Sequence, residues 1–186
     1  IDLDAFATNL SSGGKVDSVL EIGCGDGHLC ESLAGVFPEA TIVGVDIAEN
    51  PGRLFKGDPN RVRFGQMTAA ALKAEGGVFD LVVLCDVLHH VPCQERGDLV
   101  MVAWELTGPG GRLVLKDWVS SRNLATLLAY ASDRFITGDT PVFFESFREL
   151  HDLLSDVVDQ STINESWVEP HRNNVSLTVT RPPVRP

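Results

Sequence analysis

Apolar residues recur along the chain in short runs that alternate with segments of helical spacing. Five runs have the length and composition of strands: 16–22, 41–45, 61–64, 79–85 and 112–115. Between them, the segments 27–36, 68–75 and 93–106 repeat apolar residues at the spacing of a helix face. Such alternation predicts βαβ units and therefore an α/β fold with a mostly parallel sheet.

The runs 16–22 and 79–85 are apolar at consecutive positions, which predicts central strands with helices on both faces. After Asp117 the pattern changes: 122–136 and 145–154 are typical of helices, and 175–180 is expected to be a closing antiparallel strand. With 186 residues the chain predicts a single domain over 1–186. Residues 1–15 form its helical lead-in, and the prolines of 181–186 predict a loose tail.

The chain is acidic, with a formal net charge of -11 and its basic residues scattered. A polyanion would be repelled on average, so nucleic acid is not an expected partner. No apolar run approaches the roughly twenty residues that cross a bilayer, and the first residues lack a basic segment, so neither a membrane nor export is expected. The four cysteines lack paired spacing, which favours reduced thiols in a cytoplasm and predicts no metal site.

The strongest local signal is a predicted strand that runs into a glycine-rich loop and then a helix, Val19-Leu-Glu-Ile-Gly-Cys-Gly-Asp-Gly-His28. Glycines permit a close approach of the backbone to a ligand at the helix N-terminus. A dinucleotide fingerprint would need a glycine where this chain has His28. Glu21, just before the loop, suits an ammonium or sulfonium better than a pyrophosphate, so the loop favours a cationic small molecule.

Asp46 ends the second predicted strand about twenty residues after the loop, where a carboxylate can bind ribose hydroxyls. The alternative is that Asp46 only caps a following helix. Four acids fall at predicted strand ends: Glu21, Asp46, Asp86 and Asp117. They predict an acidic rim that complements a positively charged ligand.

The ordered set of motifs resembles the class I S-adenosylmethionine-dependent methyltransferase family over about residues 16 to 118. The resemblance rests on the loop 21–27, Asp46, the segment 79–91 and the turn of 106–113. It implies a Rossmann-like, doubly wound, mostly parallel seven-stranded sheet with an antiparallel C-terminal strand. It also implies S-adenosylmethionine as cofactor and S-adenosylhomocysteine as product.

The resemblance further implies that the glycine loop wraps the methionine part of the cofactor and that Asp46 holds its ribose. Gln66 and Met67 would flank the adenine, although the family often has an acidic residue there, which this chain lacks. Asp86 would support the methionine end. The complete set of implied cofactor contacts is Glu21, Gly23, Cys24, Gly25, Gly27, Asp46, Ile47, Gln66, Met67, Asp86 and Val87.

His89 and His90 directly follow the fourth predicted strand and are the candidate general bases, because an imidazole can accept a proton at neutral pH. Alternatively, one or both only hold the loop by hydrogen bonds. Asp117, at the end of the fifth predicted strand, is the third catalytic candidate and would contact the acceptor. It could equally cap a helix.

The sequence therefore favours a methyltransferase that acts on a small-molecule acceptor by in-line displacement. A second hypothesis is a non-catalytic S-adenosylmethionine-binding sensor or partner subunit, against which the paired histidines argue. A third, an NAD-dependent oxidoreductase, is disfavoured by the glycine spacing. The acceptor and the oligomeric state are not predicted.

Overall fold

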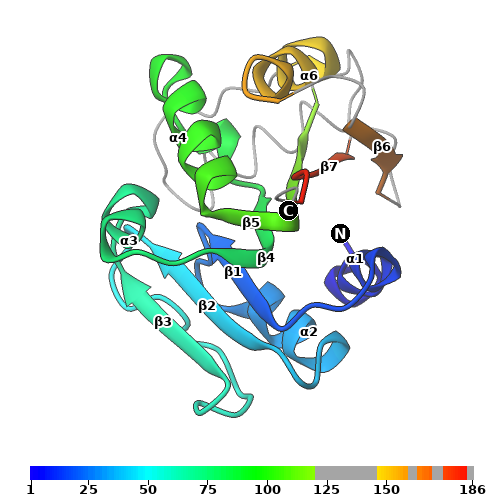
Figure 1. Ribbon diagram of the computed structural model, residues 1–186. Coiled ribbons are helices and arrows are strands. Elements are labelled where there is room, and N and C mark those ends of the chain that lie inside the picture. Colours follow the sequence, from blue (N-terminus) through cyan, green and yellow to red (C-terminus); the bar gives the residue numbers. More distant parts are fainter. Residues whose placement is uncertain (120–145, 159–162, 169–173, 184–186) are drawn as a thin grey trace.

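The computed structural model describes residues 1–119, 146–158, 163–168 and 174–183 (Figure 1). The described elements, in chain order, are α1 (Leu3–Leu10), η1 (Ser11–Gly13), β1 (Ser18–Ile22), α2 (His28–Val36), β2 (Thr41–Asp46), β3 (Val62–Gln66), α3 (Ala69–Glu75), β4 (Phe79–Cys85), η2 (Leu88–His90), α4 (Cys93–Leu106), β5 (Thr107–Trp118), α6 (Phe147–Ser155), β6 (Ile163–Trp167) and β7 (Asn174–Thr180). They confirm the predicted α/β fold and the helical lead-in.

The strands form one seven-stranded sheet in the order β3-β2-β1-β4-β5-β7-β6. The pairs among β1 to β5 are parallel, whereas β7 is antiparallel to both β5 and β6. All five predicted parallel strands are present. β5 begins at Thr107 rather than at residue 112, because Thr107 already pairs with Phe79 across an irregular register.

Strand β6 is a feature that the sequence pattern did not predict. Its residues are largely polar, and four of its five positions are exposed, so it has neither an apolar run nor a buried face. The antiparallel strand predicted at 175–180 is confirmed as β7, but it lies between β5 and β6 and does not close the sheet. The helix predicted at 122–136 lies outside the described residues.

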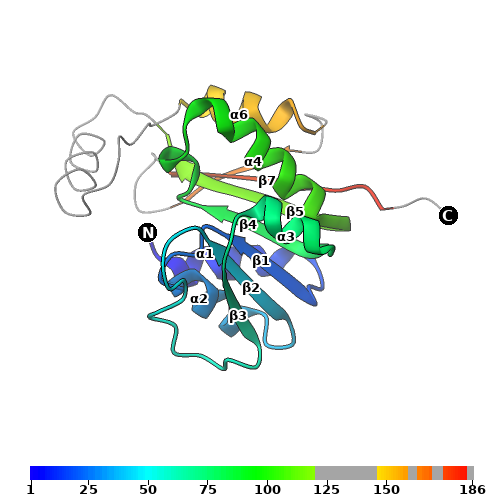
Figure 2. The ribbon, with the colours of Figure 1, turned by 90° about the vertical axis from the view of Figure 1, so that its left-hand side faces the viewer.

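Helices cover both faces of the sheet, as Figure 2 shows from the side. Helices α1 and α2 pack on the face that carries Val19, Val83 and Val114, and α3, α4 and α6 pack on the opposite face. The residues of β1 and β4 therefore alternate between two apolar cores. This arrangement confirms the prediction that these two strands are central.

The C-terminal tail is held at its first residue, which corrects the expectation of a loose end from 181 onward. The Arg181 amide donates to the Gly111 carbonyl at 2.8 Å, and the Arg181 carbonyl accepts from the Gly110 amide at 2.9 Å. The Arg181 guanidinium also donates to carbonyls at the end of α4 and lies 5.5 Å from the centre of the Trp104 ring. Within the described part of the chain, no helix has the length and apolarity needed to cross a membrane.

Candidate active site

The order of the strands reverses between β1 and β4, and the loops that follow these two strands lie against each other. Parallel α/β sheets bind ligands at this kind of switch point, outside the carboxyl ends of the strands. Gly23 has a φ of 76°, and a Cβ added to it would lie 2.5 Å from the Val87 side chain. The glycine at position 23 therefore allows the loop after β1 to pack on the loop after β4.

The other two glycines of the loop have different surroundings. A Cβ added to Gly27 would lie 3.0 Å from both Gly52 and Phe64, so this glycine is required by packing. A Cβ added to Gly25, whose φ is 48°, would meet no atom within 4 Å. Gly25 is thus where the loop backbone adjoins open space that a ligand can fill.

The Cys24 side chain points into the protein. It is buried, and its Sγ would lie 3.0 Å from a Cβ added to Gly44 on β2. Burial raises the pKa of its thiol to about 12, so the thiol is neutral and poorly nucleophilic. Cys24 therefore contributes packing, and only its backbone is placed to contact a ligand.

Asp46 connects the end of β2 to the glycine loop. Its Oδ2 accepts a hydrogen bond of 2.8 Å from the Gly25 amide, and its Oδ1 accepts one of 2.8 Å from the Ala48 amide. Residues 47–61, all of them described, form turns and bends, so the suggestion that Asp46 caps a helix is wrong. Asp46 instead fixes the glycine loop relative to β2, with its carboxylate at the carboxyl edge of the sheet.

The positions expected near ribose and adenine are neighbours of Asp46. Gln66 pairs with Asp46 in the sheet register, and the Met67 amide donates to the Asp46 carbonyl at 2.9 Å. Ile47 leaves 76% of its surface exposed, which is unusual for a large apolar side chain. The structure thus brings Asp46, Ile47, Gln66 and Met67 together at one edge.

Glu21 does not lie at the surface of the loop, which corrects its interpretation as a charged group facing a ligand. Only 3% of Glu21 is exposed. Burial raises its pKa to about 8, although hydrogen bonds from Cys30 on α2 oppose the shift. At neutral pH the group is therefore mostly protonated. Its Oε2 is buried and has no hydrogen-bond partner among the described residues.

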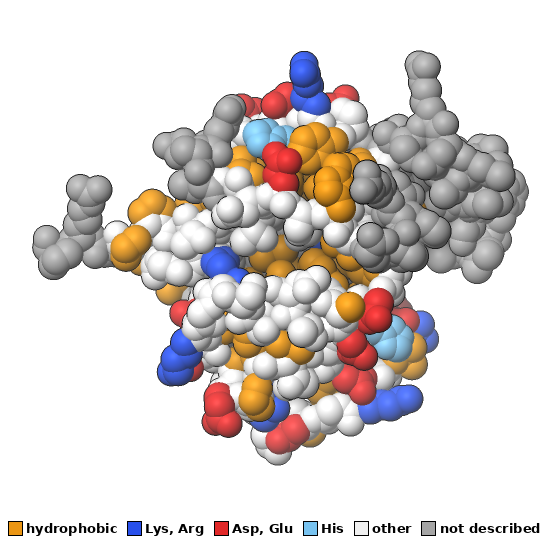
Figure 3. All heavy atoms as spheres, turned by 90° about the vertical axis from the view of Figure 1, so that its right-hand side faces the viewer, with side chains coloured by type: hydrophobic (Ala, Val, Ile, Leu, Met, Phe, Trp, Pro, Cys, Tyr) orange, Lys and Arg blue, Asp and Glu red, His pale blue; other side chains and the backbone are white. Residues whose placement is uncertain are grey.

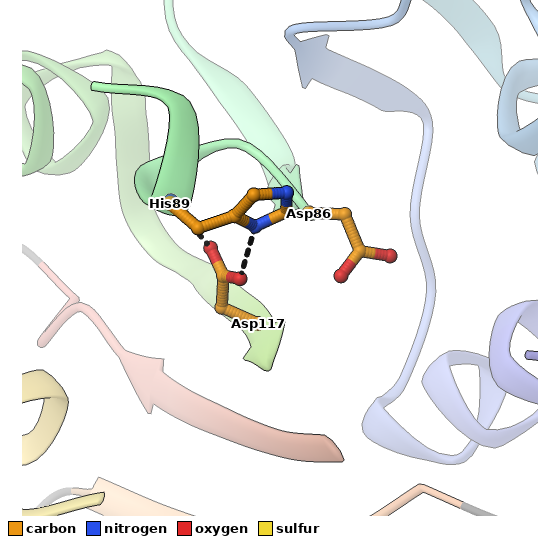
Figure 4. Close-up of side chains that lie close together, drawn as sticks. All are labelled: Asp86, His89 and Asp117. Atoms are coloured by element: carbon orange, nitrogen blue, oxygen red, sulfur yellow. Dashed lines mark hydrogen bonds and ion pairs between the residues drawn. The ribbon is translucent and has the colours of Figure 1, made fainter. Parts of the chain in front are cut away.

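His89 and Asp117 form a buried pair (Figure 4). The Nδ1 of His89 lies 2.6 Å from an Asp117 Oδ1, and the two side chains are 6% and 5% exposed. The Asp117 carboxylate also accepts hydrogen bonds from the backbone amides of Leu88, at 2.9 Å, and Trp118, at 2.7 Å. Asp117 thus holds η2 and the imidazole in place. This corrects the expectation that it contacts the acceptor directly.

The two histidines have different environments. His90 is exposed at the end of η2, and the centre of its ring lies 4.1 Å from that of His89. His89 is buried and is oriented by a carboxylate. The arrangement that makes an imidazole a directed base is therefore present at His89.

Lys116 is the residue of this site that sequence reasoning missed. Its fully buried ammonium donates to both carboxylate oxygens of Asp86, at 2.6 and 2.7 Å. Three possible metal-ligand atoms, one each from Asp86, His89 and Asp117, lie within 4.8 Å of one another, as a metal site would require. The Lys116 ammonium already supplies a cation to Asp86 in that group.

The predicted acidic rim is consequently much less negative than its residues suggest. Lys116 compensates Asp86, burial keeps Glu21 mostly protonated, and Asp117 lies beneath His89. Of the four acids, only Asp46 combines partial exposure with the lack of a basic side-chain partner among the described residues. The edge is therefore less acidic than the sequence predicts, because Lys116 compensates Asp86 and burial keeps Glu21 mostly protonated.

A comparison with known protein families identifies the chain. Residues 3–157 match the model of a methyltransferase domain family. The chain belongs to this family. It is 30% identical over 136 residues to a ubiquinone biosynthesis O-methyltransferase of Pseudomonas putida, an alignment that covers 70% of this chain and 56% of that protein.

Two further proteins extend the comparison. The chain is 29% identical over 172 residues to the 27-O-demethylrifamycin SV methyltransferase of Amycolatopsis mediterranei, which covers 89% of this chain and 59% of that protein. The fold of this chain matches that of human N-acetylserotonin methyltransferase in complex with SAM, with a TM-score of 0.72 at 18% identity. The match covers 97% of this chain and 51% of the human protein. The chain spans little more than half the length of the curated relatives it matches.

Proposed function

We propose that this methyltransferase-family chain transfers a methyl group from S-adenosylmethionine to a small-molecule acceptor. The observation that carries the proposal is the pair of loops at the switch point between β1 and β4. One loop leaves open space above Gly25 beside the Asp46 carboxylate, and the other carries His89 oriented by Asp117. The two curated relatives are named for methylation in ubiquinone biosynthesis and of a rifamycin, and both names indicate small-molecule chemistry.

The residues at this edge fit S-adenosylmethionine. Asp46 uses one lone pair of each oxygen on the backbone, so each oxygen can still accept a ribose hydroxyl. The exposed side chain of Ile47 offers an apolar surface for the adenine, whose binding would remove it from water. The methionine part would lie along Gly23 and Gly25.

Bound S-adenosylmethionine supplies a methyl group that is already activated for displacement. The protein's own residues then have to align the acceptor and remove its proton. Since the Asp117 carboxylate only accepts hydrogen bonds, the His89 Nδ1 carries the proton of that pair, which leaves Nε2 as the basic nitrogen. Nε2 lies on the side of the ring away from Nδ1, and it would accept the proton of a hydroxyl or an ammonium acceptor.

In a non-catalytic protein the His89–Asp117 pair would only hold the loop, whereas an enzyme also uses the second ring nitrogen as a base, so the pair favours the enzyme. The proposed acceptor is a small molecule with an ionisable O–H or N–H.

We also propose a cytoplasmic location, because the four cysteines are free thiols.

The proposal is tested by incubating the protein with S-adenosylmethionine labelled in the methyl group and with pooled small-molecule phenols, alcohols and amines. Label should transfer to at least one acceptor, and His89→Gln should lose the transfer while it still binds the cofactor. Cofactor binding without transfer to any pool would favour the sensor. The absence of cofactor binding would contradict both hypotheses.

A further inference from the structure

The end of β5 holds the segment that follows β4 from two sides. Lys116 and Asp117 are consecutive strand residues, so their side chains leave opposite faces of the sheet. Lys116 holds Asp86 at the beginning of the segment, and Asp117 holds η2 and the His89 imidazole. Figure 4 shows Asp86 and Asp117 on different sides of the His89 ring.

Lys116 is buried to a degree that requires a partner. Its side chain has no exposed surface, and a buried ammonium without a counter-charge is costly. The Asp86 carboxylate provides that counter-charge through two short hydrogen bonds, and the Lys116 Nζ also lies 5.6 Å from the centre of the Trp118 ring. The pair is electrically neutral as a unit.

Asp86 is held in a conformation that it would not adopt by preference. Its φ is 57°, in the left-handed region that most side chains avoid. The Asp86 amide also donates to the Lys116 carbonyl at 2.9 Å, so backbone and side chain are tied to the same residue. The Asp86 side chain is 32% exposed. It lies on the loop after β4, whose Val87 side chain packs against Gly23 of the glycine loop.

We propose that Lys116 is a positioning residue that neutralises Asp86 and thereby sets how strongly the site prefers the cationic methyl donor to the product. The inference rests on the proposed function, because it concerns that cofactor pair. S-adenosylmethionine and S-adenosylhomocysteine differ by one methyl group and by one positive charge on sulfur. A neutral Asp86–Lys116 pair discriminates little between them. An uncompensated Asp86 would retain the donor selectively.

The size of the effect follows from Coulomb's law. One unit charge within about 10 Å of another, at an effective dielectric constant of about 20 to 40, changes an affinity by about four- to fifteenfold. The quantity to measure is the ratio of the dissociation constant of S-adenosylhomocysteine to that of S-adenosylmethionine. A ratio isolates the sulfonium charge because both ligands share every other group.

The experiment compares Lys116→Met, Asp86→Asn and the double variant with the wild type by calorimetric titration with both ligands at low ionic strength. Lys116→Met should raise the ratio at least fourfold, because Asp86 then faces the sulfonium without compensation. Asp86→Asn should leave the ratio at or below the wild-type value, because the buried Lys116 either keeps its charge and opposes the sulfonium or loses its proton and becomes neutral. The double variant, which replaces the pair by two neutral side chains, should return to within about twofold of the wild type. Circular dichroism verifies that each variant is folded.

A purely structural role for Lys116 would change both affinities by the same factor and leave the ratio constant, which would overturn the inference. If Lys116→Met does not fold, Lys116→Gln is titrated in its place, because it also removes the charge but keeps an amide that can donate to Asp86, and the same rise of at least fourfold is expected. Failure of the wild type to bind either ligand would instead refute the proposed function, so the two failures are distinguishable.

Discussion

The buried carboxyl of Glu21 makes stability depend on pH in a way that a single substitution should remove. Its pKa is about 8 in the folded protein, raised by burial from an ordinary value of 4.5. Between these two pKa values, Glu21 keeps its proton in the folded protein and loses it in the unfolded chain. Glu21→Gln replaces the protonated acid by a neutral side chain of the same shape, which can still accept the hydrogen bonds from Cys30.

The sign follows from the protons bound in each state. Between the unfolded and the folded pKa the native state binds more protons, so stability falls as pH rises, and the loss ends above about pH 8. From about pH 6 to about pH 8 the loss amounts to about 2 kcal/mol. Glu21→Gln lacks this titration, so its stability relative to the wild type should rise by about 2 kcal/mol over that interval.

The assay is urea unfolding of both proteins at several pH values, with the difference in unfolding free energy plotted against pH. Titrations of all other groups cancel in that difference. Glu31→Gln is the matched control, because Glu31 is an exposed acid in the first turn of α2, the helix that covers Glu21. A difference for Glu21→Gln that stays constant across the pH range would refute the reasoning.

Three further predictions address the base, the loop and a helix cap. His89→Gln should lower kcat by about 100- to 10,000-fold while the dissociation constant of the cofactor changes less than about twofold, as measured by steady-state kinetics and calorimetry. Gly23→Ala should cost at least about 2 kcal/mol in urea unfolding because its Cβ would meet Val87, whereas Gly14→Ala, also at positive φ but with nothing nearby, should cost less. Ser146→Ala, which removes the capping box of α6, should cost about 1 kcal/mol of unfolding free energy, and an unchanged urea midpoint would contradict this role.

Much of the fold could be predicted because most of its strands and helices have a recognisable pattern of apolar residues. The strand 79–85 and the helix 93–106 were predicted with the bounds that the structure has, since each is a periodic apolar segment bordered by clear breaks. β6 could not be predicted in this way. It is an edge strand without a buried face, and only its pairing with β7 makes it a strand.

The sequence placed the candidate acids at the ends of strands, where the structure has them, but it did not reveal how their charges are compensated. The sequence pattern predicted Asp46, Asp86 and Asp117 at the ends of strands, and the structure has them there. Burial of Glu21 and the contact between Lys116 and Asp86 are tertiary facts. One signal was available: Lys116 is a lysine within a buried apolar strand, and such a residue requires a counter-charge nearby.

The central claim, that the edge between β1 and β4 binds S-adenosylmethionine with Asp46 on its ribose, is tested most directly by calorimetric titration of the wild type and Asp46→Ala. The wild type should bind S-adenosylmethionine in preference to NAD, and Asp46→Ala should weaken that binding by about 1 to 3 kcal/mol. Equal affinity of the two proteins, or a preference of the wild type for NAD, would contradict the claim.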